Sequence, residues 1–193
     1  MIKLRNVSKK YGESIVFDSF SLTVNDGDRI LVAGASGCGK TTLLRLICSF
    51  ERADGGSVDV GGAKIAVMFQ EPRLLPHKNA LDNVRAVAKK AEWSVCDKYF
   101  EKMGLSLADD GKKMPSELSG GMKQRVALAR FFTFAELSGA DTLILDEPFA
   151  ALDAERGKEL CALLSEFSDH KTLIVASHGE HDAEILGAKT VKL

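Results

Sequence analysis

The chain has 193 residues, a formal net charge of −1, and 45% hydrophobic and 27% charged residues. This length suits one well-buried domain, the composition excludes a disordered chain, and the near-neutral charge gives no sign of a nucleic-acid partner. The four cysteines are too far apart for a zinc site. No apolar run reaches the ~20 residues of a transmembrane helix, and residues 1–11 lack a signal-peptide core, so we expect a soluble, cytoplasmic protein.

The N-terminal region alternates between apolar and polar residues in short runs, at 2–4 and again at 20–24. A period of two predicts half-buried, antiparallel strands within residues 2–32. The sequence Asn-Asp-Gly-Asp at 25–28 then predicts a turn into the next strand.

A glycine-rich stretch, GASGCGKTT at residues 34–42, lies between an apolar run at 30–33 and a helix-forming segment at 43–47. Strand, glycine-rich turn and helix is the context of the phosphate loop G-x-x-x-x-G-K-[ST]. Backbone N–H groups and the helix dipole there favour an anion, Lys40 reaches the terminal phosphates, and Thr41 ligates Mg²⁺. The sequence therefore predicts a nucleoside triphosphate site. Its expected binding residues are Gly34, Ala35, Ser36, Gly37, Cys38, Gly39, Lys40, Thr41 and Thr42.

The next segment contains two glycine-rich breaks and two runs with strand character. Residues 54–57 (Asp-Gly-Gly-Ser) break the chain, residues 58–60 alternate again, and Gly-Gly at 61–62 predicts a turn. The apolar run 65–69 predicts a second buried strand that ends at Gln70.

Residues 71–118 have a different character, with helical composition at 80–90 and 93–103. We interpret them as a small helical insertion in a strand-rich frame. A further helix is expected from residue 122 to about 137.

The last third of the chain alternates between buried strands and a helix. Strands are expected at 143–146 and 173–176, with a helix at 154–167 between them. This alternation predicts a parallel α/β sheet that binds its ligand at the carboxyl ends of the strands.

Polar residues follow three of the buried strands: Gln70, the pair Asp146 and Glu147, and His178. We expect Asp146 to bind Mg²⁺ and Glu147 to orient the attacking water or accept its proton. Gln70 can contact the metal or the water, and His178 can bond the γ-phosphate or hold Glu147. A lone His or Gln at a strand end is more often structural, but agreement among the strand ends favours the catalytic interpretation.

A second candidate anion site is Ser119, Gly120 and Gly121, where a hydroxyl and two glycines begin a helix. Alone, this pattern is more often a plain helix cap. Here it belongs to the run LSGGMKQR at 118–125.

With this run, the sequence resembles the ATP-binding-cassette (ABC) family over essentially its whole length. The motifs stand in the family's order: phosphate loop 34–42, Gln70, the LSGGM signature 118–122, the acidic strand 143–147, the D-loop 151–153 and the switch histidine His178.

The resemblance implies an α/β P-loop NTPase fold with a parallel core sheet, an N-terminal antiparallel β subdomain and a helical insertion subdomain. It implies one domain, 1–193, with a core formed by 1–70 and 119–193 and a helical subdomain at 71–118. By similarity, Tyr11 stacks on adenine, the alternative being a plain edge-strand tyrosine.

The resemblance also implies an ATPase that uses ATP and Mg²⁺. Its members form head-to-tail dimers in which Ser119, Gly120 and Gly121 of one subunit close on the γ-phosphate held by the other. Such a subunit would power transport through a separate membrane permease, on the cytoplasmic face of the inner membrane.

Residues 69–76 and 79–84 look like those of bacterial importers for sulfonates, nitrate or taurine, which implies import and a solute-binding protein as a further partner. The region 57–70 is short for an importer, Gly179 stands where the family more often has Asp, and the sequence stops at Leu193. We expect these departures to affect regulation and dimer stability while hydrolysis survives.

Two other classes of function remain open. One is an ABC ATPase that transports nothing, such as a DNA-handling protein or a cell-division regulator; DNA-handling members usually carry coiled-coil or zinc insertions, absent here. The other is a nucleotide-binding module without turnover, against which the presence of both Glu147 and His178 argues.

Overall fold

The computed structural model describes residues 1–178 and 181–193 of the chain. The described elements, in chain order, are β1 (Ile2–Tyr11), β2 (Ser14–Val24), β3 (Arg29–Ala33), α1 (Lys40–Ile47), β4 (Gly55–Asp59), β5 (Ile65–Met68), α2 (Ala80–Arg85), α3 (Trp93–Lys102), α4 (Gly120–Ser138), β6 (Thr142–Asp146), α5 (Ala154–Phe167), β7 (Thr172–Ser177), α6 (His181–Leu186) and β8 (Lys189–Lys192). Short 3-10 helices occur at Lys90–Glu92 and Pro115–Glu117.

The strands form two separate sheets. The first is antiparallel, in the order β2-β1-β4, and the second is parallel, in the order β5-β6-β7-β3-β8. The predicted antiparallel N-terminal strands and parallel core sheet are therefore confirmed. β3 and β6 both pair with β7, which places the phosphate loop and the acidic strand end one strand apart at the same edge of the sheet.

Alternate residues of the parallel strands pack into two different apolar clusters. Leu31, Leu145 and Val175 join the cluster that contains residues of α4, α5 and α6, whereas Ile30 and Ile174 join the cluster that contains α1 and strands of the antiparallel sheet. Both faces of the sheet are therefore covered, which is why its central strands read as continuous apolar runs.

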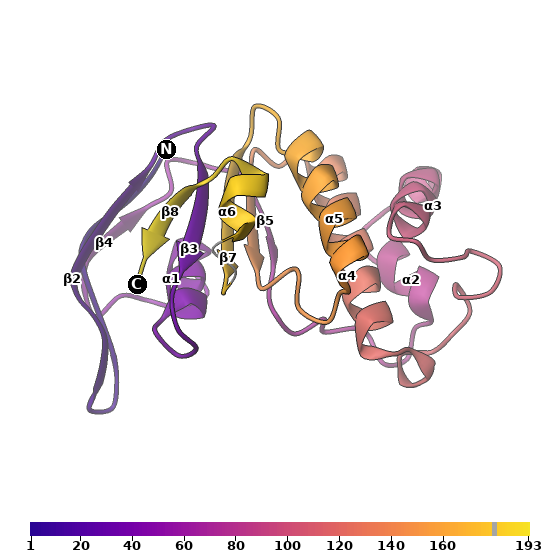
Figure 1. Cartoon of the computed structure of the whole chain (residues 1–193), viewed down its shortest axis with the longest axis horizontal. Coiled ribbons are helices and arrows are strands. Elements are labelled where there is room, and N and C mark those ends of the chain that lie inside the picture. The colour runs from indigo at the N-terminus through magenta and orange to yellow at the C-terminus, as the bar shows by residue number, and fades with distance from the viewer. Residues whose placement is uncertain (179–180) are drawn as a thin grey trace.

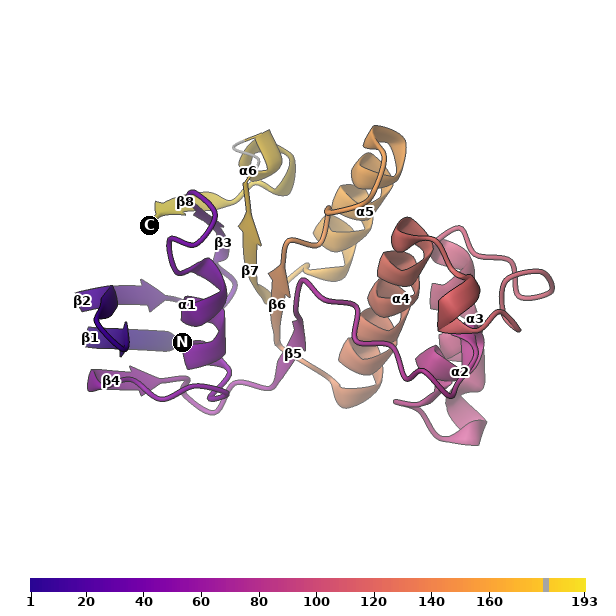
Figure 2. The ribbon, with the colours of Figure 1, turned by 90° about the horizontal axis from the view of Figure 1, so that it is seen from below.

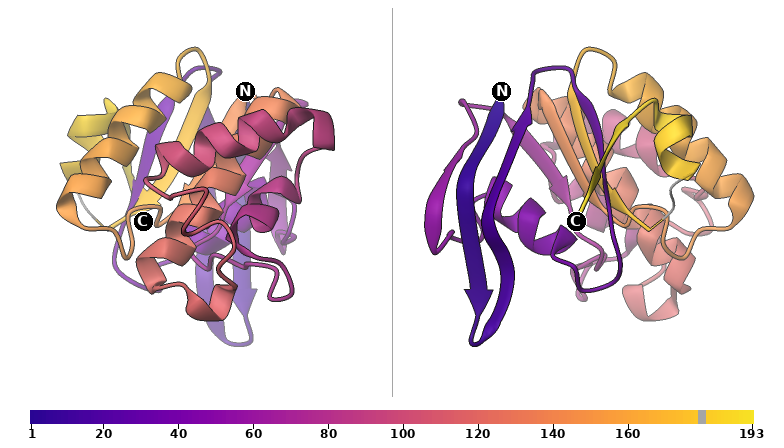
Figure 3. Two further views of the ribbon diagram at one scale, coloured as in Figure 1. Left: turned by 90° about the vertical axis from the view of Figure 1, so that its right-hand side faces the viewer. Right: turned by 60° about the vertical axis from the view of Figure 1, so that its left-hand side comes forward.

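The helices extend these layers on either side of the parallel sheet. α1 lies between the two sheets, and α4 and α5 lie on the opposite face of the parallel sheet (Figures 2 and 3). α2 and α3 pack on the outer side of α4, farthest from the antiparallel sheet (Figure 1).

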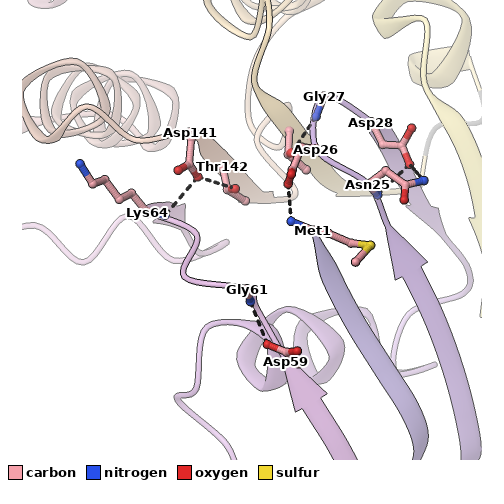
Figure 4. A network of polar contacts seen from close by, with 11 residues as sticks. Met1, Asn25, Asp26, Gly27, Asp28, Asp59, Gly61, Lys64, Asp141 and Thr142 are labelled. Atoms are coloured by element: carbon pink, nitrogen blue, oxygen red, sulfur yellow. Dashed lines mark hydrogen bonds and ion pairs between the residues drawn. The ribbon is translucent and has the colours of Figure 1, made fainter.

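A network of short polar contacts joins the turns at the amino ends of the parallel strands, opposite the phosphate loop (Figure 4). The Asp141 carboxylate accepts hydrogen bonds from the Lys64 backbone N–H at 3.0 Å and from the Thr142 hydroxyl at 2.9 Å. The amino group of Met1 pairs with Asp26. These contacts fix the turns that enter β3 and β6.

Several expected boundaries were wrong. The strand expected at 65–69 is β5, which ends at Met68 and stands at the edge of the described sheet; alternate residues, which point to one face, are buried, and those on the other face are only partly buried. The break expected at 54–57 is already part of β4 from Gly55 onward, since β1 supplies the pairing. The helix expected at 80–90 ends at Arg85.

In the carboxyl-terminal part, α6 precedes β8, a short edge strand that pairs with β3 and ends one residue before Leu193. Gly179 lies outside the described residues. Among the described residues, no helix is long and apolar enough to cross a membrane.

Candidate functional site

The phosphate loop follows β3, whose last four residues are buried, and ends in α1, which begins at Lys40. Two of its glycines have positive φ, +81° at Gly37 and +109° at Gly39, which L-residues rarely adopt. A Cβ at Gly39 would lie 2.7 Å from the Val16 side chain of β2. Glycine is therefore required at Gly39 by conformation and by space.

Lys40 is 6% exposed, and its ammonium group is held inside the loop. Nζ donates hydrogen bonds to the backbone oxygens of Gly34 at 2.8 Å and Ala35 at 3.1 Å. It also lies 3.7 Å from Glu147 Oε1 and 3.4 Å from His178 Nδ1. The loop thus holds a buried cation next to the ends of β6 and β7.

Thr41 and Asp146 join the loop to β6. The Thr41 hydroxyl donates a 2.6 Å hydrogen bond to Asp146 Oδ2. Burial raises the pKa of Asp146 above its ordinary value, although the Thr41 hydrogen bond and the charge of Lys40 oppose this shift.

Glu147 comes next and has a strained backbone, with φ +49° for a non-glycine residue. Its Oε1 atom is buried and lies 3.1 Å from His178 Nε2, yet it accepts no hydrogen bond of good geometry from any described residue. Burial raises the pKa of Glu147, and the charges of His178 and Lys40 oppose the shift. The site therefore presents a buried oxygen with unused capacity to accept a proton.

These side chains surround one cavity of about 380 Å³. The volume falls in the range of small-molecule sites. Its lining residues come from the β1–β2 hairpin, the phosphate loop, and the ends of β5, β6 and β7: Tyr11, Ser14, Val16, Ser36, Gly37, Gly39, Lys40, Thr41, Thr42, Gln70, Asp146, Glu147 and His178.

Three residues of the loop face elsewhere. Gly34 and Ala35 line a second cavity beside His178, and Lys40 binds their carbonyl oxygens. Cys38 is partly buried, and a Cβ at Gly34 would lie 2.5 Å from its sulfur. Cys38 therefore packs within the loop.

The Tyr11 ring stands at the outer rim of the cavity, 46% exposed, at the end of β1. Lys9 lies under it, with Nζ 5.1 Å from the ring centroid. Lys9 is in turn held by Glu51 at 3.0 Å and by the Arg52 carbonyl at 2.9 Å. The ring thus has one face on a buried cation and an exposed surface beside the cavity.

The signature residues do not line this cavity. Ser119 caps α4, where its hydroxyl accepts a hydrogen bond from the Met122 backbone N–H at 3.2 Å. Ser119 and Gly120 are exposed, and a Cβ at Gly121 would lie 2.8 Å from the Ala151 carbonyl oxygen. One chain therefore carries two separate candidate anion sites.

Sequence reasoning missed three residues at the site. Ser14 and Val16 line the cavity because the β1–β2 hairpin places them beside Tyr11, and Ser14 pairs directly with it. Gln124 on α4 is buried and bonds the backbone after β6. Its signal was a glutamine on the stripe of α4 that also holds the buried Leu128 and Phe131.

The sequence and the structure are similar to those of known proteins. A family model described as "ABC transporter" matches residues 17–150. SsuB 1 of Paraburkholderia xenovorans (strain LB400), an aliphatic sulfonates import ATP-binding protein, is 37% identical over 193 residues, which cover 96% of this chain and 55% of that protein. CmpD of Synechocystis sp. (strain ATCC 27184 / PCC 6803 / Kazusa), a bicarbonate transport ATP-binding protein, is 38% identical and covers 100% of this chain.

The chain thus spans little more than half of that SsuB protein and 73% of CmpD. Among solved structures, a dimeric post-hydrolysis state of the ATP-binding cassette MJ0796, bound to ADP and Pi, matches with a TM-score of 0.88. The two chains are 27% identical, and the match covers 100% of this chain and 94% of the other.

Proposed function

Because this chain belongs to the ABC transporter family, we propose that it is the ATP-binding and ATP-hydrolysing subunit of a transporter whose membrane path is a separate permease. The observation that carries the proposal is the single cavity at which Lys40, Asp146 and Glu147 meet. A buried cation, a buried acid and a second, partly buried acid beside a phosphate loop suit a polyphosphate and its hydrolysis.

In the proposed complex, the phosphates lie on the loop at residues 34–42, within reach of the Lys40 ammonium and the N-terminus of α1. ATP would replace the Gly34 and Ala35 carbonyls as partners of Lys40. Tyr11 would stack on adenine at the rim, a contact worth about 1–3 kcal/mol for a base on an aromatic ring.

Glu147 is the proposed catalytic base. Its buried Oε1 atom accepts no hydrogen bond from the described residues, so it is placed to accept a proton from the attacking water or to orient that water toward the γ-phosphate. His178, 3.1 Å away, would hold the carboxylate or bond the γ-phosphate, and Gln70 would help to orient the water. The raised pKa of Glu147 makes it a better proton acceptor once ionised.

The donor set also fits Mg²⁺. This ion takes oxygen ligands and is usually held by one or two carboxylates together with substrate phosphates. The Thr41 hydroxyl is bonded to the Asp146 carboxylate, and Gln70 lines the same cavity, so these three side chains would supply that chemistry. When bound, the ion would neutralise charge that develops on the phosphates.

We further propose a head-to-tail dimer with two ATP molecules at its interface. The exposed Ser119 and Gly120 begin α4, at a place where the helix dipole and free N–H groups favour an anion, yet they lie outside the chain's own cavity. A second copy would bring its phosphates there. The dimeric MJ0796 cassette supports such an assembly.

The permease would dock on the side of the helical insertion. A groove of about 190 Å³ lies between the segment next to Gln70 and helix α4. It is lined by apolar residues that include Val67, Phe69, Phe131 and Phe134, and by the charged Glu71, Arg73 and Arg130. Phe134, which lines this groove, is 40% exposed. A partner bound in this groove would contact Phe69 and Glu71, which flank Gln70 of the nucleotide site.

In the proposed division of the chain, residues 1–70 and 119–193 form the core and residues 71–118 form the helical subdomain. The docking surface has residues from both parts. α4 belongs to the core by this division, but it packs on α2 and α3 as well as on β5. α4 would therefore transmit movement between the two parts. A chain docked on a permease in this way would lie at the periphery of the membrane, and we propose its cytoplasmic face as the location.

Import is the direction we propose, because the SsuB and CmpD relatives are named as import or transport ATP-binding proteins. A solute-binding protein would complete such a system. These relatives serve different solutes, aliphatic sulfonates and bicarbonate, so we propose no particular solute. None of the relatives reported above supports the alternative of a cell-division or DNA-handling regulator.

The test of the transport proposal is affinity purification of the full chain from native membranes, followed by identification of the proteins that co-purify. A multi-span membrane protein as the main partner is the expected result, and it should be lost in a Phe134→Asp variant. A partner from DNA or division complexes would overturn the transport proposal and leave the ATPase chemistry intact.

A further inference from the structure

The side chain of Gln124 connects α4 to the backbone that carries Glu147. Gln124 is 2% exposed, and its Nε2 atom donates hydrogen bonds to the carbonyl oxygens of Pro148 at 3.3 Å and Glu147 at 3.5 Å. A buried amide aimed at two successive carbonyls is a specific arrangement, because each buried polar group needs a partner.

Glu147 needs support at this point because its backbone is strained. A non-glycine residue in the left-handed region costs about 1–2 kcal/mol and persists only where its surroundings hold it. On the side of β7, the Glu147 N–H donates to the Ala176 carbonyl at 2.8 Å. Within the turn, the Ala150 N–H donates to the Glu147 carbonyl at 3.1 Å. Gln124 adds a contact from α4.

We propose that Gln124 is a positioning residue for Glu147, an inference that rests on the proposed function. The orientation of the 147–148 peptide sets the direction of the Glu147 side chain. Without the Gln124 amide, only the Ala150 N–H holds the Glu147 carbonyl among the described contacts, so the left-handed turn is less well held and the carboxylate moves away from Lys40 and His178.

Ser119 caps the same helix five positions before Gln124, and Gly121 packs against the Ala151 carbonyl. The first turns of α4 therefore contact the segment 147–151 at two places. Through Gln124, the helix that presents the signature residues to a second copy also holds the chain's own catalytic base.

The test compares Gln124→Met, which keeps the volume and removes the donor, with Gln124→Glu, which keeps the shape and replaces the donor by an acceptor. Thr133→Val is the matched control, since Thr133 is equally buried on α4 and its hydroxyl bonds only the Ala129 carbonyl of its own helix among the contacts described. ATP hydrolysis, the Kd for ATP and ATP-dependent dimerisation are measured on the full chain.

We expect kcat to fall by ~10-fold to ~100-fold in both Gln124 variants, the scale on which a misplaced reacting group slows an enzyme. The Kd for ATP and the ATP-bound dimer should be unchanged, because the phosphate loop that holds Lys40 and the helix cap at Ser119 are not altered. Thr133→Val should leave all three quantities as in wild type. A loss of binding in proportion to kcat would reveal a general packing defect and overturn the proposal.

Hydrogen exchange supplies a readout that does not need turnover. The amides of Glu147 and Ala150 should exchange at least ~10-fold faster in Gln124→Met than in Thr133→Val. Equal exchange in the two variants would overturn the positioning role. A wild-type chain that hydrolyses no ATP would instead refute the proposed function, while the exchange rates still decide whether Gln124 holds Glu147.

Discussion

The Thr41 hydroxyl donates a 2.6 Å hydrogen bond to the Asp146 carboxylate, which joins the phosphate loop to the end of β6 across 105 residues of sequence. Both oxygens face the cavity that also contains Gln70. The contact fixes the relative position of the Thr41 hydroxyl and the Asp146 carboxylate, the two groups that we propose as Mg²⁺ ligands. Removing the hydroxyl therefore tests the proposed metal site.

Replacing Thr41 by Val keeps the shape of the side chain and removes its oxygen. We expect the Mg²⁺ concentration that gives half-maximal ATP hydrolysis to rise by about tenfold or more, on the scale of losing a group that holds or orients a metal ligand. Thr41→Ser restores the hydroxyl and should restore the Mg²⁺ dependence. An unchanged Mg²⁺ dependence in Thr41→Val would remove Thr41 from the metal site.

Tyr11 gives a test of base recognition. Tyr11→Ala should weaken ATP binding by about 1–3 kcal/mol, whereas Tyr11→Phe keeps the ring and should bind as wild type. Ile15→Ala is the control, because Ile15 is 69% exposed on the same hairpin and does not line the cavity. Titration calorimetry with ATP measures the difference, and equal Kd values for Tyr11→Ala and Ile15→Ala would show a plain surface tyrosine.

Replacement by Ala should change the free energy of unfolding in opposite directions at Gly39 and at Gly157. Gly39→Ala should lower the free energy of unfolding by about 1–3 kcal/mol, because φ is +109° and the new Cβ meets Val16. Gly157→Ala should raise it by about 0.5–1 kcal/mol, because Gly157 lies within α5 with no atom within 4 Å of the new Cβ. Urea denaturation measures both values, and a stable Gly39→Ala protein would contradict the described loop conformation.

The pair formed by Lys9 and Glu51 predicts a pH dependence of stability. The hydrogen bond from Lys9 lowers the pKa of Glu51 below its ordinary 4.5, and the same contact raises the pKa of Lys9 above 10.5. The stabilisation is therefore present between these two values. It is lost as the pH falls through the lowered pKa of Glu51, or rises through the raised pKa of Lys9.

Lys9→Met should remove this contribution. Between pH 5 and pH 10 the variant should be less stable than wild type, and the difference should shrink toward pH 3. Urea denaturation over this pH range measures the effect, with the exposed Lys64→Met as control. A difference that stays constant down to pH 3 would show that lost packing, rather than charge, explains the effect.

Local patterns predicted most of the fold because the central strands are buried on both faces. The runs at β6 and β7 consist almost wholly of buried residues, and the helix expected at 154–167 has the observed bounds of α5. β5 is equally apolar in sequence but stands at the edge of the sheet, and strand order depends on long-range pairing that a local run does not encode.

The site was predictable to the extent that it depends on strand ends. Asp146 ends β6, Glu147 follows it, and His178 follows β7, so the topology alone brings these residues to the carboxyl ends of neighbouring strands. Ser14 reaches the cavity from the other sheet, and Gln124 acts through the backbone of Glu147. Contacts of this kind arise from packing between elements, and no motif marks them.

The measurement that tests the account most directly is phosphate release from ATP by the purified chain and by its Glu147→Gln variant, with Kd for ATP determined in parallel. We predict a kcat lower by ~100-fold or more in the variant, the contribution of a positioned base, with an unchanged Kd and an ATP-bound dimer that accumulates. Equal turnover by the two proteins would contradict the assignment of Glu147 and the mechanism built on it.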